Sequence, residues 1–82
     1  PCSSFKSEGS LVFGVEKGTK SYTMLVNLPK AGGVVLKQYN KKGKLVASTP
    51  IEGNMAKVNV DANAVKCQLE GSVEVFEIIP NK

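Results

Sequence analysis

The chain has 82 residues, which suffices for one domain with a single core, so we expect one domain over residues 1–82. Its formal net charge of +4 comes from lysine alone among the basic residues, since there is no Arg and no His. Without His, the usual general base near neutral pH and imidazole metal ligands are missing. Without Arg, the bidentate fork that reads guanine edges and phosphates is missing. We therefore expect no enzyme, no cofactor or metal site, and no specific nucleic-acid binding.

Segments of alternating apolar and polar residues, separated by Gly or Pro roughly every eight to twelve residues, predict β-strands along the whole chain. No apolar run approaches the roughly 20 residues of a membrane helix, so no membrane span is expected. A short hairpin tip is expected at Asn40-Lys41-Lys42-Gly43, where glycine can adopt the left-handed backbone conformation of such turns. The first five expected strands cover residues 10–17, 20–28, 34–39, 45–49 and 56–60.

The last third of the chain predicts a second hairpin. Residues 65–69 alternate, Glu70-Gly71 reads as the turn, and residues 73–79 form the returning strand. Between Val75 and Phe76 the apolar residues change parity, which indicates either a β-bulge or a strand buried on both faces. The predicted fold is all-β, an antiparallel two-sheet β-sandwich of six or seven short strands with one disulfide.

The predicted core takes the inward-facing apolar residues of every strand. Its members are Leu11, Phe13, Val15, Met24, Val26, Val34, Leu36, Leu45, Val58, Val60, Val65, Leu69, Val73 and Val75.

The two cysteines, Cys2 and Cys67, have no metal-ligand spacing. In a small domain whose chain begins at Pro1 rather than Met, we expect a disulfide between them, and with it secretion into an oxidising compartment. The alternative is two buried, reduced thiols in a cytosolic protein.

The strongest candidate binding surface surrounds the expected hairpin tip. Four lysines, Lys37, Lys41, Lys42 and Lys44, lie there beside Tyr39 without an acidic residue among them. Such a cluster favours docking of a protein with an acidic surface, an anionic lipid headgroup or a polyanionic glycan, through a field that salt weakens. The alternative is a hairpin tip that lysine merely keeps solvated.

Two family resemblances add expectations. The run from Asp61 to Cys67 resembles the approach to strand F of an immunoglobulin domain, with Val65 in place of the family's Tyr and no Trp in the chain. Residues 16–26 resemble the entry into strand B, and residues 38–43 resemble the region after the strand C core. This resemblance implies an immunoglobulin-like sandwich that serves as an adhesion or receptor module.

In its length and in the placement of Cys2 and Cys67, the chain also resembles the MAX-type effectors of plant-pathogenic fungi, which are small secreted β-sandwiches. That resemblance implies a virulence protein that binds a host protein through sheet edges or strand-facing lysines. Our hypothesis is a secreted, monomeric, non-enzymatic module that binds another protein. The alternatives are a secreted effector or toxin-like protein, and an enzyme inhibitor whose Pro29–Gly33 loop enters a cleft.

Overall fold

The computed structural model describes the backbone of residues 5–28 and 32–82 and the side chains of residues 11–28 and 32–82. Within these ranges the chain is all-β and antiparallel, as the alternation predicts. Nowhere in these ranges does a helix occur that is long and apolar enough to cross a membrane. The strands are β1 (Phe5–Gly14), β2 (Ser21–Asn27), β3 (Val35–Asn40), β4 (Leu45–Pro50), β5 (Met55–Asn59) and β6 (Ala64–Asn81).

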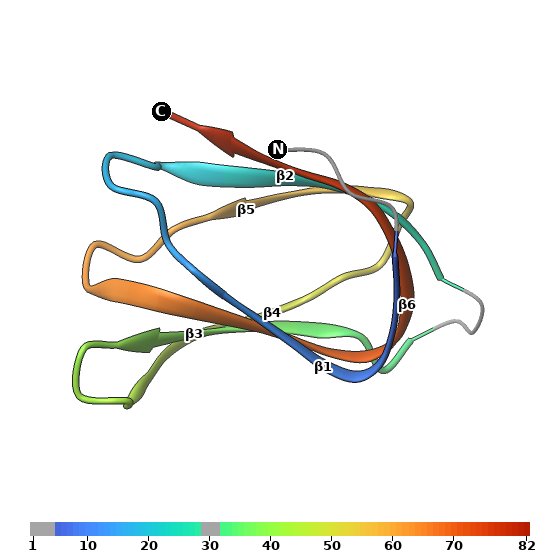
Figure 1. Cartoon of the computed structure of the whole chain (residues 1–82), viewed down its shortest axis with the longest axis horizontal. Helices are drawn as coiled ribbons and strands as arrows, with labels where there is room; N and C mark the ends of the chain where they lie inside the picture. The colour runs from blue at the N-terminus through green and yellow to red at the C-terminus, as the bar shows by residue number, and fades with distance from the viewer. Residues whose placement is uncertain (1–4, 29–31) are drawn as a thin grey trace.

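The long strand β6 organises the sheet. Strand β3 pairs with its first half, from Ala64 to Glu70, and β2 pairs with its second half, from Glu74 to Asn81. β4 extends the sheet beyond β3, β5 extends it beyond β2, and β1 pairs with residues 66–75 of β6. Because β6 bends back on itself, the six strands form one strongly curled half-barrel (Figure 1). The prediction of two separate sheets was therefore wrong: both halves of the structure share one strand.

Gly71 is the point where β6 bends, and the predicted hairpin turn at this position was wrong. Its φ of 120° lies in a region that side chains rarely allow, so glycine lets the strand curve without breaking its pairing. Gly9 of β1 lies directly opposite. A Cβ at Gly71 would stand 2.7 Å from the carbonyl oxygen of Gly33 and 3.0 Å from Cα of Val34. The residue thus provides both the bend and the space for the start of β3.

The apolar residues of β6 change parity after Val75 because the strand has a β-bulge there. A bulge was the first of the two structures predicted for this position. Leu25 pairs with Glu77 while the next residue, Val26, pairs with Val75, which leaves Phe76 as the extra residue. Val75 is therefore buried on the same side of the sheet on which Ile78 packs against the core.

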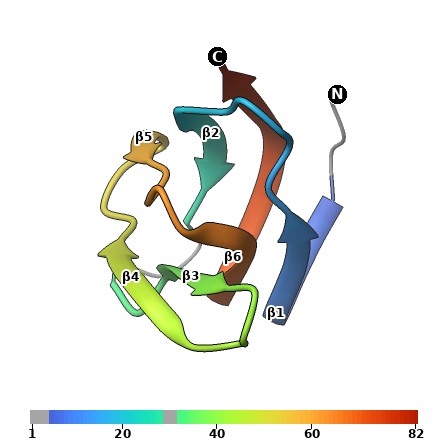
Figure 2. The same ribbon diagram turned by 90° about the vertical axis from the view of Figure 1, so that its left-hand side faces the viewer.

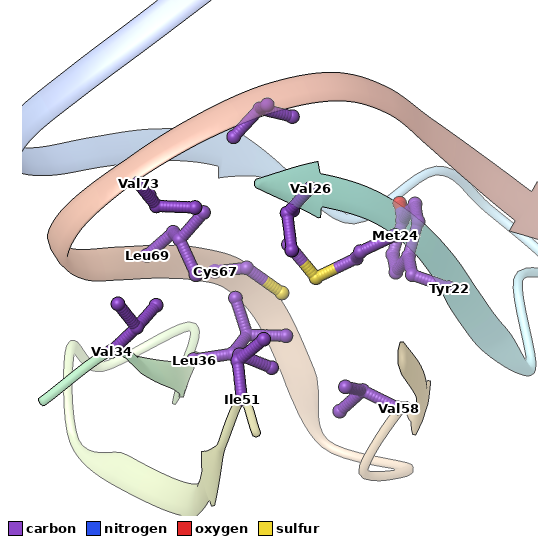
Figure 3. Packing of buried hydrophobic residues seen from close by; sticks show 11 residues of the cluster. Tyr22, Met24, Val26, Val34, Leu36, Ile51, Val58, Cys67, Leu69 and Val73 are labelled. Atoms are coloured by element: carbon purple, nitrogen blue, oxygen red, sulfur yellow. The ribbon is translucent and has the colours of Figure 1, made fainter. Parts of the chain in front are cut away.

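The core fills the concave side of the half-barrel, with β2, β3, β5 and β6 contributing around Ile51 from the β4–β5 connection (Figures 2 and 3). Ile51 and Tyr22 are buried core residues absent from the predicted list; Tyr22 meets Phe13 edge-to-face at 5.4 Å between ring centroids. Eight predicted core residues are confirmed as buried: Met24, Val26, Val34, Leu36, Val58, Leu69, Val73 and Val75. Four others are partly buried against this core: Leu11, Phe13, Val15 and Val60.

Two predicted core residues are exposed, and irregular pairing explains both. Leu45 is 47% exposed and Val65 is 46% exposed. The register between β3 and β4 shifts next to Tyr39, which moves Leu45 to the outer face. The register between β3 and β6 shifts beside the same residue, so Ala64 is buried and Val65 becomes the extra residue. Strict alternation fails at each of these two shifts.

Candidate functional site

Of the two cysteines, Cys67 lies among the described residues. Cys67 lies in β6 with no exposed surface and carries a free thiol, and burial raises its pKa to about 11. Cys2 lies outside the described residues. No disulfide occurs in the part of the chain that the structure describes, so the disulfide of the predicted fold is not part of the observed architecture.

Strand β3 carries two of the predicted binding residues, Lys37 and Tyr39, on the outer face of the half-barrel. Lys37 is engaged, because its Nζ lies 3.2 Å from a carboxylate oxygen of Glu70 on β6. Tyr39 pairs with Lys66 of β6, whose Nζ lies 5.0 Å from the centre of the tyrosine ring. This cation–π contact adds a lysine, distant in the sequence, to the predicted cluster.

The β3–β4 tip, residues 40–44, is held in one conformation by Asn40. Its side-chain oxygen accepts hydrogen bonds from the backbone N–H groups of Lys42 and Lys44, each at 2.9 Å. The backbone oxygen of Asn40 accepts a third bond, from Gly43, whose φ of 79° is the left-handed conformation expected there. Lys41, Lys42 and Lys44 are exposed on this fixed turn and form no ion pair with any residue whose side chain is described.

The β5–β6 loop, residues 60–63, lies beside this tip and is fixed by Gln38. This buried side chain of β3 donates a hydrogen bond to the carbonyl of Asn59 at 3.0 Å and accepts one from the N–H of Asp61 at 2.8 Å. Asp61 in turn accepts a hydrogen bond from the N–H of Asn63. Between tip and loop lies an open groove of about 500 Å³, lined by Asn40, Lys41, Lys42, Ala62, Asn63 and Val65.

Charges are segregated along the half-barrel. The β1–β2, β3–β4 and β5–β6 connections gather at one end, where the chain also reaches Lys82 (Figure 1). Acidic residues lie away from this end. Glu70, Glu74 and Glu77 belong to β6, and Glu52 lies in the β4–β5 connection. We call the first region the basic end; its charged residues are Lys17, Lys20, Lys41, Lys42, Lys44, Lys66 and Lys82 against Glu16 and Asp61.

The structure places Lys41, Lys42 and Lys44 on one turn that follows Tyr39 in the chain, whereas Lys37 forms an ion pair with Glu70. Its geometry suits an anionic group, which the lysine ammonium groups and the side-chain amides of the groove can contact. No group of three or more His, Cys, Asp or Glu residues that could hold a metal ion occurs among the described residues.

The contribution of Lys66 and of the β1–β2 turn was not predicted from the sequence. Lys66 is 27 positions from Tyr39 and reaches it only through the pairing of β3 with β6. Lys17 and Lys82 meet through a hydrogen bond from the Lys82 ammonium to the Lys17 carbonyl at 2.9 Å. Both contacts depend on strand register, which the local alternation does not specify.

Comparison with known proteins adds no relative: no protein-family model, no curated protein and no solved structure matched this chain.

Proposed function

We propose that this chain is a non-enzymatic binding module that recognises an acidic segment of another protein with its basic end. The observation that carries the proposal is the β3–β4 tip, where Lys41, Lys42 and Lys44 are exposed on a hydrogen-bonded turn beside an open groove. The lining of that groove contains two lysines and no acidic residue.

Two physical features support protein recognition at this place. The concentration of like charges at one end produces a field that steers an anionic partner towards the groove and accelerates association. The turn and the neighbouring loop are already fixed by Asn40 and Gln38, so binding orders little backbone. Ala62 and Val65 are apolar residues of the groove lining, and they can contact the methylene groups of acidic side chains.

The proposal is tested by nuclear magnetic resonance titration with capped octaglutamate, an acidic peptide without other recognition features. We expect the amide signals of residues 40–44 and 61–66 to shift at low salt. The shifts should shrink when ionic strength rises from about 20 mM to about 300 mM, since the Debye length then falls well below the size of the patch.

Two double variants separate charge from local structure. Lys41→Glu with Lys42→Glu should abolish the shifts while the spectrum of the free protein stays folded, because surface substitutions of this kind change stability by only about 0.5 kcal/mol. Lys41→Arg with Lys42→Arg keeps the charge and should retain binding. If the glutamate variant binds octaglutamate as the parent does at low salt, the tip is only a solvated turn and the proposal fails.

Secretion, and with it the adhesion-module and effector alternatives, stands as a further part of the proposal. It is supported by the small all-β fold and would be strengthened by a bond between Cys67 and Cys2. The inhibitor alternative rests on the Pro29–Gly33 loop, of which residues 29–31 lie outside the described part of the chain.

A further inference from the structure

We propose that the acidic partner segment binds as an extended strand that pairs with the free edge of β4, so that the half-barrel gains a seventh strand in the complex. This inference rests on the proposed function and adds its binding mode. The bound segment is an extended peptide with acidic residues at one end.

The backbone of β4 has hydrogen-bonding groups to offer. Among the described strands β4 pairs with β3 alone. The N–H of Ile51 bonds to the carbonyl of Val34 at 2.9 Å, which fixes the phase of the antiparallel ladder. By that phase, Thr49 exchanges hydrogen bonds with Leu36 of β3, whereas the backbone groups of Ser48 point away from β3. Pro50 shares the outward phase, where its missing N–H costs no ladder bond.

The side chains of β4 do not protect this edge. Residues 45–50 include no charged residue, and Leu45, Ser48 and Pro50 are exposed. Soluble proteins commonly place lysine on an edge strand to prevent pairing with another chain. Strand β5 follows that practice, because Lys57 occupies its centre and is exposed. The uncharged β4 edge therefore differs from the β5 edge of the same sheet.

Charge determines which kind of strand fits. Lys44 immediately precedes β4, and Lys41 and Lys42 lie at the turn before it, so one end of the free edge points into the lysine cluster. A paired strand spans about 3.3 Å per residue, and a segment of about six residues covers β4. Acidic residues that continue such a segment past Leu45 would meet the three ammonium groups, whereas basic residues there would be repelled.

The test uses two synthetic probes and two proline variants. The first probe is a capped peptide of six alternating threonine and valine residues followed by three glutamates; the second carries three lysines instead. Ser48→Pro removes one outward N–H from β4. Lys57→Pro is the matched control, because the bonds from Val26 N–H to Asn54 and from Val60 N–H to Lys20 place the N–H of residue 57 on the free edge of β5.

We expect the acidic probe to bind the parent protein and the Lys57→Pro variant alike, and to bind the Ser48→Pro variant about threefold to tenfold more weakly, the range that one hydrogen bond is worth. The lysine probe should not bind. Equal affinity of the acidic probe for Ser48→Pro and Lys57→Pro would overturn edge pairing. If octaglutamate still binds in that case, docking at the basic end survives without the strand.

A second measurement covers the case in which a proline variant does not fold. In the parent protein, the outward amide of Ser48 should exchange with solvent rapidly when free and slowly with the acidic probe bound. Unchanged exchange at Ser48 under saturating probe would contradict the pairing, whatever the variants do.

Discussion

At the scale of single residues, the side chain of Gln38 places a polar amide in the buried interior. Gln38 is 1% exposed, yet its amide is satisfied at both ends by backbone groups next to the β5–β6 loop. A buried amide with both partners in place fixes a single arrangement of the strands around it, whereas an unpaired one would be costly. Gln38 thus links the interior of β3 to the loop that borders the candidate groove.

Cys67 is fully buried in the apolar core, and its environment gives a chemical prediction. Because the thiol is fully buried and burial raises its pKa to about 11, almost no thiolate is present near neutral pH. Iodoacetamide should therefore leave Cys67 unmodified in the folded protein at pH 8. In denaturant with reductant the residue should become labelled, as mass spectrometry of its peptide would show.

The same experiment decides the pairing predicted from the sequence. If iodoacetamide does not modify Cys67 in denaturant until a reductant is added, Cys67 is bonded to Cys2. The free thiol that the structure gives Cys67 would then be incorrect. Labelling without reductant would instead remove the disulfide and weaken the argument for secretion that depends on it.

At the scale of elements, β6 replaces the predicted terminal hairpin by one strand of 18 residues that serves both halves of the sheet. The bend at Gly71 and the bulge at Phe76 give the strand its curvature and change which residues face inward.

Gly71→Ala should destabilise the fold strongly. Its Cβ would lie 2.7 Å from the carbonyl oxygen of Gly33, and the residue would keep a φ of 120°, so both a clash and backbone strain arise. We expect the free energy of unfolding to fall by about 2 kcal/mol or more in urea titrations.

Gly53→Ala serves as the control, because the nearest atom to its added Cβ is 4.0 Å away and its φ is not in the positive region. Its effect should stay within about 0.5 kcal/mol. A Gly71→Ala protein as stable as the Gly53→Ala protein would show that the bend tolerates a side chain.

At the scale of the whole molecule, charge is distributed along the long axis of the half-barrel rather than evenly over it. The basic end and the acidic residues around the bend of β6 give the molecule an electrostatic direction beyond its net charge of +4. Adsorption to a charged surface should then depend on orientation.

Two variants of equal net charge test this polarity. Lys42→Glu alters the basic end and Lys57→Glu alters the middle of β5, and both residues are exposed. On a cation exchanger, Lys42→Glu should elute at clearly lower salt than Lys57→Glu, because the matrix binds the basic end. Identical elution would mean that net charge alone controls adsorption.

The predicted bounds of β2, β3, β4 and β5 agree with the structure within one residue at each end, since alternation and flanking Gly or Pro identify such strands. The predictions were wrong where one sequence signal is compatible with two structures. A glycine between two apolar runs can mark either a hairpin turn or a bend within one strand. Gly71 lies at a bend within β6. Leu45 and Val65 alternate correctly along the chain and are nevertheless exposed, because register shifts are set by pairing with β3.

The same limit applies to the candidate site. The lysines of the β3–β4 tip are neighbours in sequence and were found from it. Lys66 and the ion pair that engages Lys37 depend on which strands lie side by side, and that information is not local.

The dependence of the sheet on β6 has a consequence for how the chain reaches its folded state. Strands β1, β2 and β3 all pair with the strand that the ribosome makes last among the six. Before it emerges, the pairings of the described strands that can form are those of β3 with β4 and of β2 with β5. Folding of this domain must therefore follow synthesis of residues 64–81, and its many non-local pairings place it among the slower small domains, with folding times of about milliseconds to seconds. During that interval the nascent strands expose unpaired edges, which are the surfaces that chaperones protect.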